Sequence, residues 1–198
     1  MEGGAQVAQD FSAEDQGAKS PNHDNVVVLK NLDSAMRRRG PSANMAELAE
    51  HAGVPENIVR GVFPKGRAQL VEAIIGGACS EFDDVVTGPM LTAPTPREAL
   101  QEAADGLAAY YEGGARHCLF ELFSVPGGTD HDVLIKDTAK RFLDALTLTL
   151  TRMGKAPDAA DVRAKRVLAE LQGTLILGRL TEDPSLFRAF TDSLARMR

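Results

Sequence analysis

The sequence predicts an all-α protein of about nine helices, divided into a small N-terminal domain and a larger C-terminal one. Apolar residues recur at helical spacing over most of the chain, whereas the strict alternation of a strand is hard to find. Residues 45–63, MAELAEHAGVPENIVRGVF, indicate two short helices joined at Gly53, which is how a helix-turn-helix is built. We therefore expect a disordered arm over 1–22, a helix-turn-helix domain over 23–68 and a second helical domain over 69–198.

The first domain contains three predicted helices, of which the first covers about residues 25–39. Three arginines crowd its last turn, where they either clamp a phosphate or form a solvated helix end. Asn44 is the expected N-cap of the second helix, and Glu47, three residues later, completes a capping box. Gly53 suits the left-handed turn, and Pro55 suits the start of the third helix because it lacks an N–H.

The second domain contains six predicted helices separated by segments rich in glycine and proline. The first of them is long and carries a buried apolar stripe, and Gly76-Gly77 interrupts it and is expected to bend it. The expected ranges are about 67–87, 94–111, 117–125, 130–153, 157–180 and 184–197.

The composition is that of an ordinary globular protein, with 43% hydrophobic residues, 25% charged residues and a net charge of −6. Residues 22–70 hold seven basic and five acidic residues, so this section alone is net basic, as phosphate contact requires. No signal peptide and no membrane-length apolar stretch is visible, so we expect a cytoplasmic protein without a membrane partner.

The motifs of common enzymes and metal sites are missing from the sequence. We find no HExxH, GxSxG, P-loop or GxGxxG pattern, so we expect no enzyme and no cofactor. Cys79 and Cys118 lack CxxC spacing, which argues against a zinc site or a disulfide framework. Asp130-His131-Asp132 does not share one helix face, so we expect no metal site there.

Several motifs together resemble the TetR/AcrR family of bacterial transcriptional regulators over about residues 25–197. At the N-terminal end the resemblance rests on LAEHAGV at 48–54 and on FPKGRAQL at 63–70. At the C-terminal end it rests on ELQGTLILGRLTEDPSLFRAF at 170–190, and CLFELFSV at 118–125 is similar to a segment in some members. The resemblance implies a homodimeric repressor that binds a palindromic double-stranded DNA operator and releases it when an unknown small-molecule effector binds.

The resemblance also implies a set of DNA-contacting residues on and around the second and third helices. The sequence departs from the family there, because Asn57, Ile58 and Arg60 stand where members commonly carry Gly, Thr or Ser, and Tyr. Gly61 also weakens the helix, by about 1 kcal/mol relative to alanine. A degenerate member that acts through a protein partner, or as a small-molecule-binding module, is therefore the alternative. The candidate DNA-binding residues are Asn44, Pro55, Glu56, Asn57, Arg60, Lys65 and Arg67.

The resemblance places an effector pocket in the second domain and a four-helix dimer interface on the last two helices. For both sets, the alternative is an ordinary core within one chain, because apolar residues at helical spacing are more often core. The candidate pocket residues are Tyr110, Tyr111, His117, Cys118, Phe120, Phe123, Phe142 and Leu146. The candidate interface residues are Leu168, Leu171, Leu175, Leu186, Phe190 and Leu194.

Overall fold

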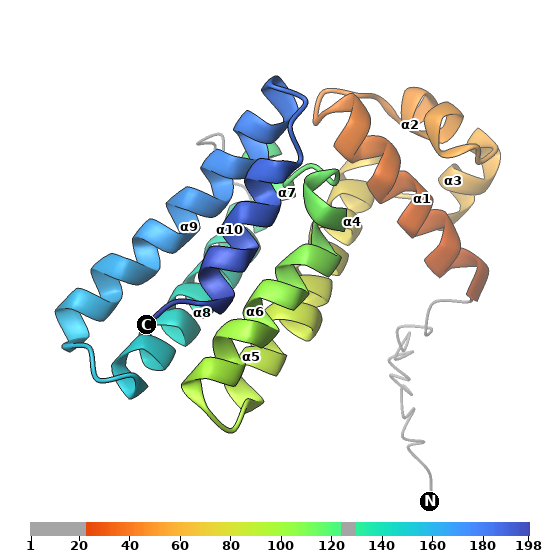
Figure 1. Ribbon diagram of the computed structural model, residues 1–198. Helices are drawn as coiled ribbons and strands as arrows, with labels where there is room; N and C mark the ends of the chain where they lie inside the picture. Colours follow the sequence, from red (N-terminus) through yellow and green to blue (C-terminus); the bar gives the residue numbers. More distant parts are fainter. Residues whose placement is uncertain (1–22, 124–129) are drawn as a thin grey trace, which may run out of the picture.

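The computed structural model describes residues 23–123 and 130–198, and every regular element in these ranges is helical (Figure 1). The all-α prediction is therefore confirmed, whereas the predicted arm over residues 1–22 lies outside the described residues. The α-helices are α1 (His23–Arg39), α2 (Met45–Ala52), α3 (Glu56–Val62), α4 (Arg67–Phe82), α5 (Gly88–Thr92), α6 (Pro96–Tyr110), α7 (Leu119–Leu122), α8 (Asp130–Arg152), α9 (Pro157–Leu180) and α10 (Ser185–Ala195). A π-helical segment, η1, covers Asp83–Thr87, and a 3₁₀ turn, η2, covers Glu112–Gly114.

Helices α2 and α3 form the predicted helix-turn-helix, and local sequence explains both of its ends. The side chain of Asn44 accepts a hydrogen bond from the Glu47 N–H (3.0 Å), and the Glu47 carboxylate accepts one from the Asn44 N–H (2.8 Å). This capping box satisfies two backbone donors at the start of α2. Gly53 ends α2 in the left-handed conformation, with φ 64°, where a side chain would be strained.

The sequence predicts that the fourth helix ends at about Thr87. In the structure, α4 continues through η1 into α5, and this helical segment ends near Thr92. Pro89 explains the π-helical turn, since proline has no N–H and its ring would clash with the carbonyl four residues earlier in an α-helix. The N–H of Gly88 bonds instead to the carbonyl of Asp83, five residues back. The predicted interruption at Gly76-Gly77 is wrong, since α4 runs through both glycines.

The π-helical turn also explains how closely α6 packs against η1. A Cβ atom added at Gly106 would lie only 2.0 Å from the carbonyl oxygen of Val85. Because Pro89 cannot donate to that carbonyl, the oxygen is left to face the neighbouring helix. Gly106 is therefore required by a backbone-to-backbone contact between the two helices.

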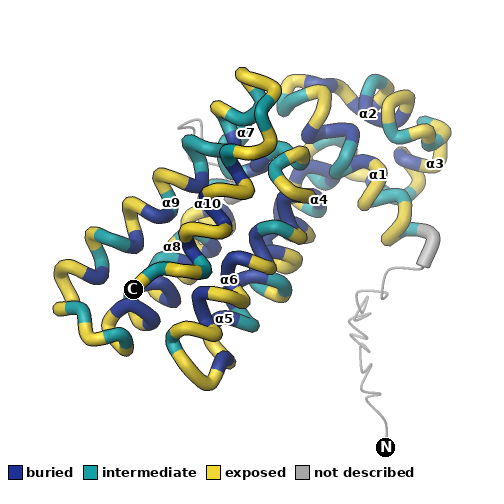
Figure 2. The backbone as a smooth tube through the Cα atoms, in the orientation of Figure 1, coloured by how far each residue is buried: buried dark blue, intermediate teal, exposed yellow. Residues whose placement is uncertain are grey.

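Two hydrophobic cores run along the molecule, and α4 contributes to both (Figures 1 and 2). The N-terminal core joins α1, α2 and α3 to the first part of α4, from Leu70 to Cys79, and to Leu119 of α7. The C-terminal core begins at Phe82 and lies between α6, α8, α9 and α10. The two cores therefore share α4, and we call the helices around each core the N-terminal and the C-terminal domain.

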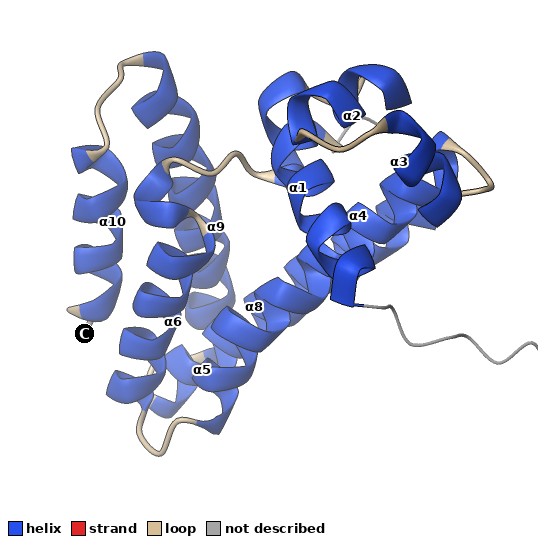
Figure 3. Ribbon diagram, turned by 90° about the vertical axis from the view of Figure 1, so that its right-hand side faces the viewer, coloured by secondary structure: helices blue, strands red, loops and turns tan. Residues whose placement is uncertain are grey.

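The last three helices have nearly the predicted bounds, whereas α7 is much shorter than expected. The sequence predicts a helix over about 117–125, but α7 contains only Leu119–Leu122. Part of that prediction, from residue 124, lies outside the described residues. Figure 3 shows α6, α9 and α10 side by side at the end of the molecule away from α2 and α3.

Candidate nucleic-acid interface and effector site

Helix α3 turns one face inward and leaves the other open. Val59 is fully buried in the N-terminal core, while Asn57, Ile58 and Arg60 are exposed on the opposite side. Ile58 is 45% exposed, although a large aliphatic side chain normally packs against its own chain. Pro55, at the N-cap, is exposed as well. The outer face of α3 is thus free to contact another molecule.

Arg60 and Glu56 form an ion pair on this outer face. The Arg60 Nε atom donates to the Glu56 carboxylate over 2.9 Å, one helical turn away. Both side chains are exposed, 65% for Arg60 and 41% for Glu56, and a pair of this kind contributes at most about 1 kcal/mol. Arg60 can therefore exchange Glu56 for a stronger acceptor. While the ion pair is formed, Glu56 neutralises the charge of Arg60.

Lys65 and Arg67 follow α3 and have different environments. Lys65 is exposed, as a phosphate-contacting residue must be. The guanidinium of Arg67 instead donates to the backbone carbonyls of Ala43 (3.0 Å) and Pro41, in the loop before α2. Arg67 therefore fixes the start of α4 to the helix-turn-helix, and its guanidinium is engaged inside the domain.

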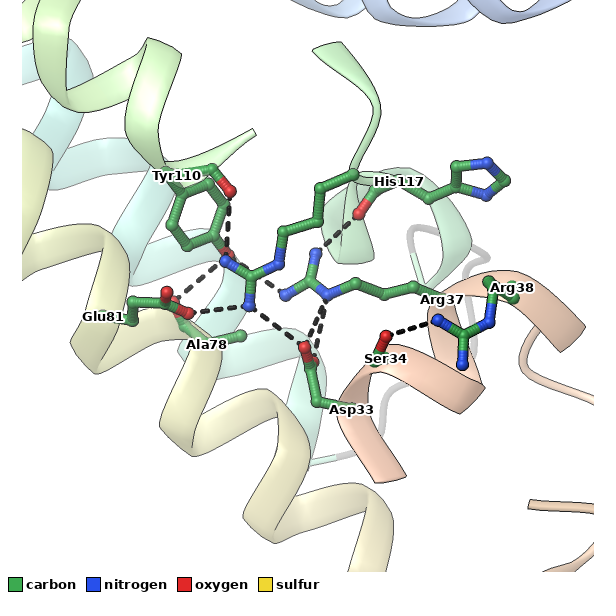
Figure 4. A network of polar contacts seen from close by, with 9 residues as sticks. Asp33, Ser34, Arg37, Arg38, Ala78, Glu81, Tyr110 and His117 are labelled. Atoms are coloured by element: carbon green, nitrogen blue, oxygen red, sulfur yellow. Dashed lines mark hydrogen bonds and ion pairs between the residues drawn. The ribbon is translucent and has the colours of Figure 1, made fainter. Parts of the chain in front are cut away.

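The three arginines at the end of α1 also differ in their environments. Arg37 fits neither of the two predicted roles, a phosphate clamp or a solvated helix end. Arg37 is only 3% exposed and ion-paired with Asp33 on the same helix (2.8 Å). It also donates to the carbonyl of His117 (2.6 Å) and to the hydroxyl of Tyr110 (3.4 Å) (Figure 4). Burial opposes its charge, but Asp33 and Tyr110 together outweigh this and raise the pKa of Arg37. Arg37 is therefore an interdomain contact.

A second arginine, Arg116, completes this connection and was not singled out from the sequence. It donates to Asp33 (3.0 Å) and to Glu81 (2.7 Å), and its guanidinium carbon lies 4.6 Å from the centre of the Tyr110 ring. Asp33 thus accepts from one arginine of each domain. The sequence offers only a weak signal for this, because Asp33 of α1, Glu81 of α4 and Arg116 of the turn before α7 lie far apart in the chain.

Most of the predicted effector-pocket residues lie in the C-terminal core. Tyr110, Tyr111, Cys118, Phe142 and Leu146 are each at most 3% exposed and pack in the C-terminal core. Burial raises the pKa of Tyr110 to about 12, despite the nearby arginines. A molecule bound among them would have to displace these side chains, and the pocket at these residues stays a prediction.

The remaining three predicted pocket residues lie in three different environments. His117 lies beside a polar cavity at the domain junction, where burial and Arg179 lower its pKa. Phe123 packs against the N-terminal core. Only Phe120 lines an apolar groove, of about 360 Å³, between α7, α8 and α9. The groove is lined by Phe120, Glu121, Ile135, Ala139, Leu168, Gln172 and Ile176.

The predicted dimer-interface residues are also mostly internal. Leu171, Leu175, Phe190 and Leu194 are at most 4% exposed and belong to the C-terminal core of their own chain. Leu168 and Leu186 are half-buried. The alternative of an intrachain core therefore describes four of the six residues. The exposed apolar side chains of α9 are others, namely Val162, Leu177 and Leu180, which are 48%, 52% and 76% exposed.

The described residues contain no group of three or more His, Cys, Asp or Glu side chains placed to hold a metal ion. Within the same ranges, none of the helices has both the length and the apolar character needed to cross a membrane.

Comparison with known proteins supports the fold and not a close relationship. No protein-family model and no curated protein matches the chain. A TetR transcriptional regulator from Legionella pneumophila matches with a TM-score of 0.72 at 17% identity, over 89% of this chain and 97% of that one. A TetR-family transcriptional regulator from Streptomyces coelicolor matches with a TM-score of 0.69 at 16% identity, over 86% and 93%.

A third match is the fatty acid degradation regulator FadR from Bacillus halodurans, with a TM-score of 0.61 at 12% identity, over 87% of this chain and 99% of that one. In all three cases the match spans nearly the whole length of both chains. The chain therefore has the fold of TetR-family transcriptional regulators.

Proposed function

We propose that this chain is a ligand-responsive transcriptional regulator, a repressor, that binds a palindromic DNA operator as a homodimer. The observation that carries the proposal is the open outer face of α3, on which Asn57, Ile58 and Arg60 are exposed on a helix anchored by Val59. In a helix-turn-helix, this second helix is the one that enters the major groove. Two such helices in a dimer contact half-sites about 34 Å apart, or one DNA turn.

The proposed DNA-binding residues are those of this face and its flanks. Asn57 and Arg60 are suited to base edges, because an amide pairs with adenine and a guanidinium with guanine. Asn44, Pro55 and Lys65 are exposed around them, where backbone contacts to phosphate are made. We leave Arg67 out of the direct contacts, because its guanidinium is bound to the loop before α2.

Replacing Arg60 tests the proposal directly. We expect Arg60→Ala to weaken binding to the DNA upstream of the protein's own gene by about 1–3 kcal/mol, measured by fluorescence anisotropy. Lys140→Ala is the matched control, because Lys140 forms the same kind of one-turn ion pair, with Asp144, on α8. The proposal fails if the wild-type protein does not bind this DNA at low salt, where phosphate contacts are strongest.

Replacing Glu56 gives the opposite prediction. Glu56→Gln removes a negative charge from the DNA-facing surface and releases Arg60 from its ion pair. We expect tighter DNA binding and a steeper loss of affinity with salt, because one more cation is then available to phosphate. An unchanged affinity in Glu56→Gln would show that this face lies away from the DNA. It would favour the alternative, a small-molecule-binding module or protein-binding member of the fold that no longer reads DNA.

The effector site of this proposal is the apolar groove between α7, α8 and α9. Phe120, Leu168 and Ile176 give it apolar walls, and Gln172 supplies one amide that can orient a ligand. We infer an effector with an apolar body and a hydrogen-bonding group. Such a ligand releases the operator only by binding more tightly to the conformation that does not fit DNA.

A further inference from the structure

A polar cavity of about 490 Å³ lies at the junction of the two domains, and it is larger than the apolar groove. One wall is α1, and the opposite wall comes from the end of α4, the end of α6 and the turn before α7. Sites for small molecules commonly have volumes of about 300–1,000 Å³, so this cavity has room for one. Any molecule bound there contacts both domains at once.

The cavity lining carries an excess of positive charge. Lys30, Arg37, Arg38 and Arg116 face Asp33, Glu81 and Glu112, which leaves one positive charge uncompensated among the lining residues. At the buried end the charges balance, because Arg37 and Arg116, which are 3% and 14% exposed, pair with Asp33 and Glu81. The excess lies at the exposed end of the lining, where Lys30 and Arg38 face Glu112 alone.

The same lining is rich in hydrogen-bond donors. Lys30, Asn31 and Ser34 place an ammonium, an amide and a hydroxyl on the α1 wall, beside the two guanidinium groups. Guanidinium groups present planar N–H pairs that match carboxylate and phosphate oxygens. An uncompensated positive charge that is surrounded by donors is stabilised by an anion.

We propose that the junction cavity binds a small anion with two or more negative charges, of the carboxylate or phosphate class. The anion pairs with Lys30 and Arg38 on α1 and with Arg116 on the opposite wall, and so bridges the two domains. This site is separate from the apolar groove and shares with it none of its lining residues. Its occupation stabilises the arrangement of the domains seen here, because the anion binds this arrangement and not the unfolded chain.

Calorimetric titration of the full chain with inorganic phosphate and with citrate, at constant ionic strength, tests the proposal. We expect saturable binding of at least one of them, with one site per chain, and a higher midpoint of thermal unfolding. Lys30→Gln and Arg38→Gln should each weaken binding about tenfold, because each removes one charge-assisted contact. Both residues are exposed and lie outside the ion pairs of Arg37 and Arg116, so the fold should be retained.

Lys165→Gln is the control, because Lys165 forms an exposed ion pair with Asp161 on α9 and does not line the cavity. It should bind the anion as tightly as the wild-type protein. Binding of phosphate alone, or of citrate alone, supports the site and identifies its class. The proposal is wrong if neither probe shows saturable binding, or if Lys165→Gln weakens binding as much as Lys30→Gln. The titration contains no DNA, so its outcome is independent of the regulatory function proposed above.

Discussion

Single residues decide how the two domains are joined. Arg37 is nearly inaccessible, and its guanidinium reaches Asp33 on its own helix and both His117 and Tyr110 in the other domain. Arg38, the next residue, is exposed and bonds only locally, to Ser34 (2.6 Å). Helical geometry rotates neighbouring positions by about 100°, so two adjacent arginines have unrelated environments.

This contrast predicts different stabilities for two matched variants. Arg37→Gln should lower the free energy of unfolding by about 3–5 kcal/mol, because it breaks a buried ion pair and leaves acceptors without donors. Arg38→Gln should change it by less than about 0.5 kcal/mol, as exposed substitutions usually do. Urea denaturation followed by circular dichroism measures both. Equal effects of the two substitutions would contradict the buried interdomain role of Arg37.

The residue scale is also where sequence-based prediction was weakest. Capping at Asn44 and the turn at Gly53 were predicted correctly, because both depend on neighbours only a few residues away. The environment of Arg116 could not be predicted, since its partners Asp33 and Glu81 lie 83 and 35 residues away in the chain. Likewise, periodicity shows that Leu171 and Leu175 face something apolar, but not whether that surface belongs to the same chain.

At the scale of elements, the sequence predicts the helices well and their irregularities poorly. The bounds of α9 agree with the prediction because Pro157 marks its start and a long apolar pattern follows. The passage from α4 through η1 to α5 was missed, because Gly88-Pro89 usually ends a helix. A π-helical turn lets the chain continue past the proline, and the sequence pattern contains no signal for that choice.

The contact between Gly106 and the Val85 carbonyl predicts a large effect for a small substitution. Gly106→Ala should lower the free energy of unfolding by about 3 kcal/mol, because the added methyl group would overlap a backbone atom that cannot move alone. Gly173→Ala, on α9, is the control, since a Cβ there would meet no atom within 4 Å. It should stabilise the helix by up to about 1 kcal/mol. Thermal denaturation that ranks the two variants in the opposite order would refute the close approach.

At the scale of the whole molecule, the proposed dimer needs a surface that the single chain leaves open. The best apolar surface on the last two helices is formed by Leu177 and Leu180 of α9, because both are exposed. We expect Leu177→Glu and Leu180→Glu, combined, to give a folded monomer in sedimentation velocity, since two buried charges would oppose association. Leu175→Glu should instead unfold the chain, because Leu175 is 1% exposed in its own core. An unchanged dimer in the double variant would place the interface elsewhere.

The backbone contact at Gly106 has a mechanical consequence for the long rod formed by α4, η1 and α5. Two helices that touch through main-chain atoms have no flexible side chains between them to absorb sliding, so the rod can pivot at Val85 more easily than it can shift lengthwise. Its far end, at Arg67, lies eighteen residues away, or about 27 Å along a helix. The rod then rotates about Val85. A tilt of about 5° displaces its start by roughly 2 Å, and α2 and α3 move with it.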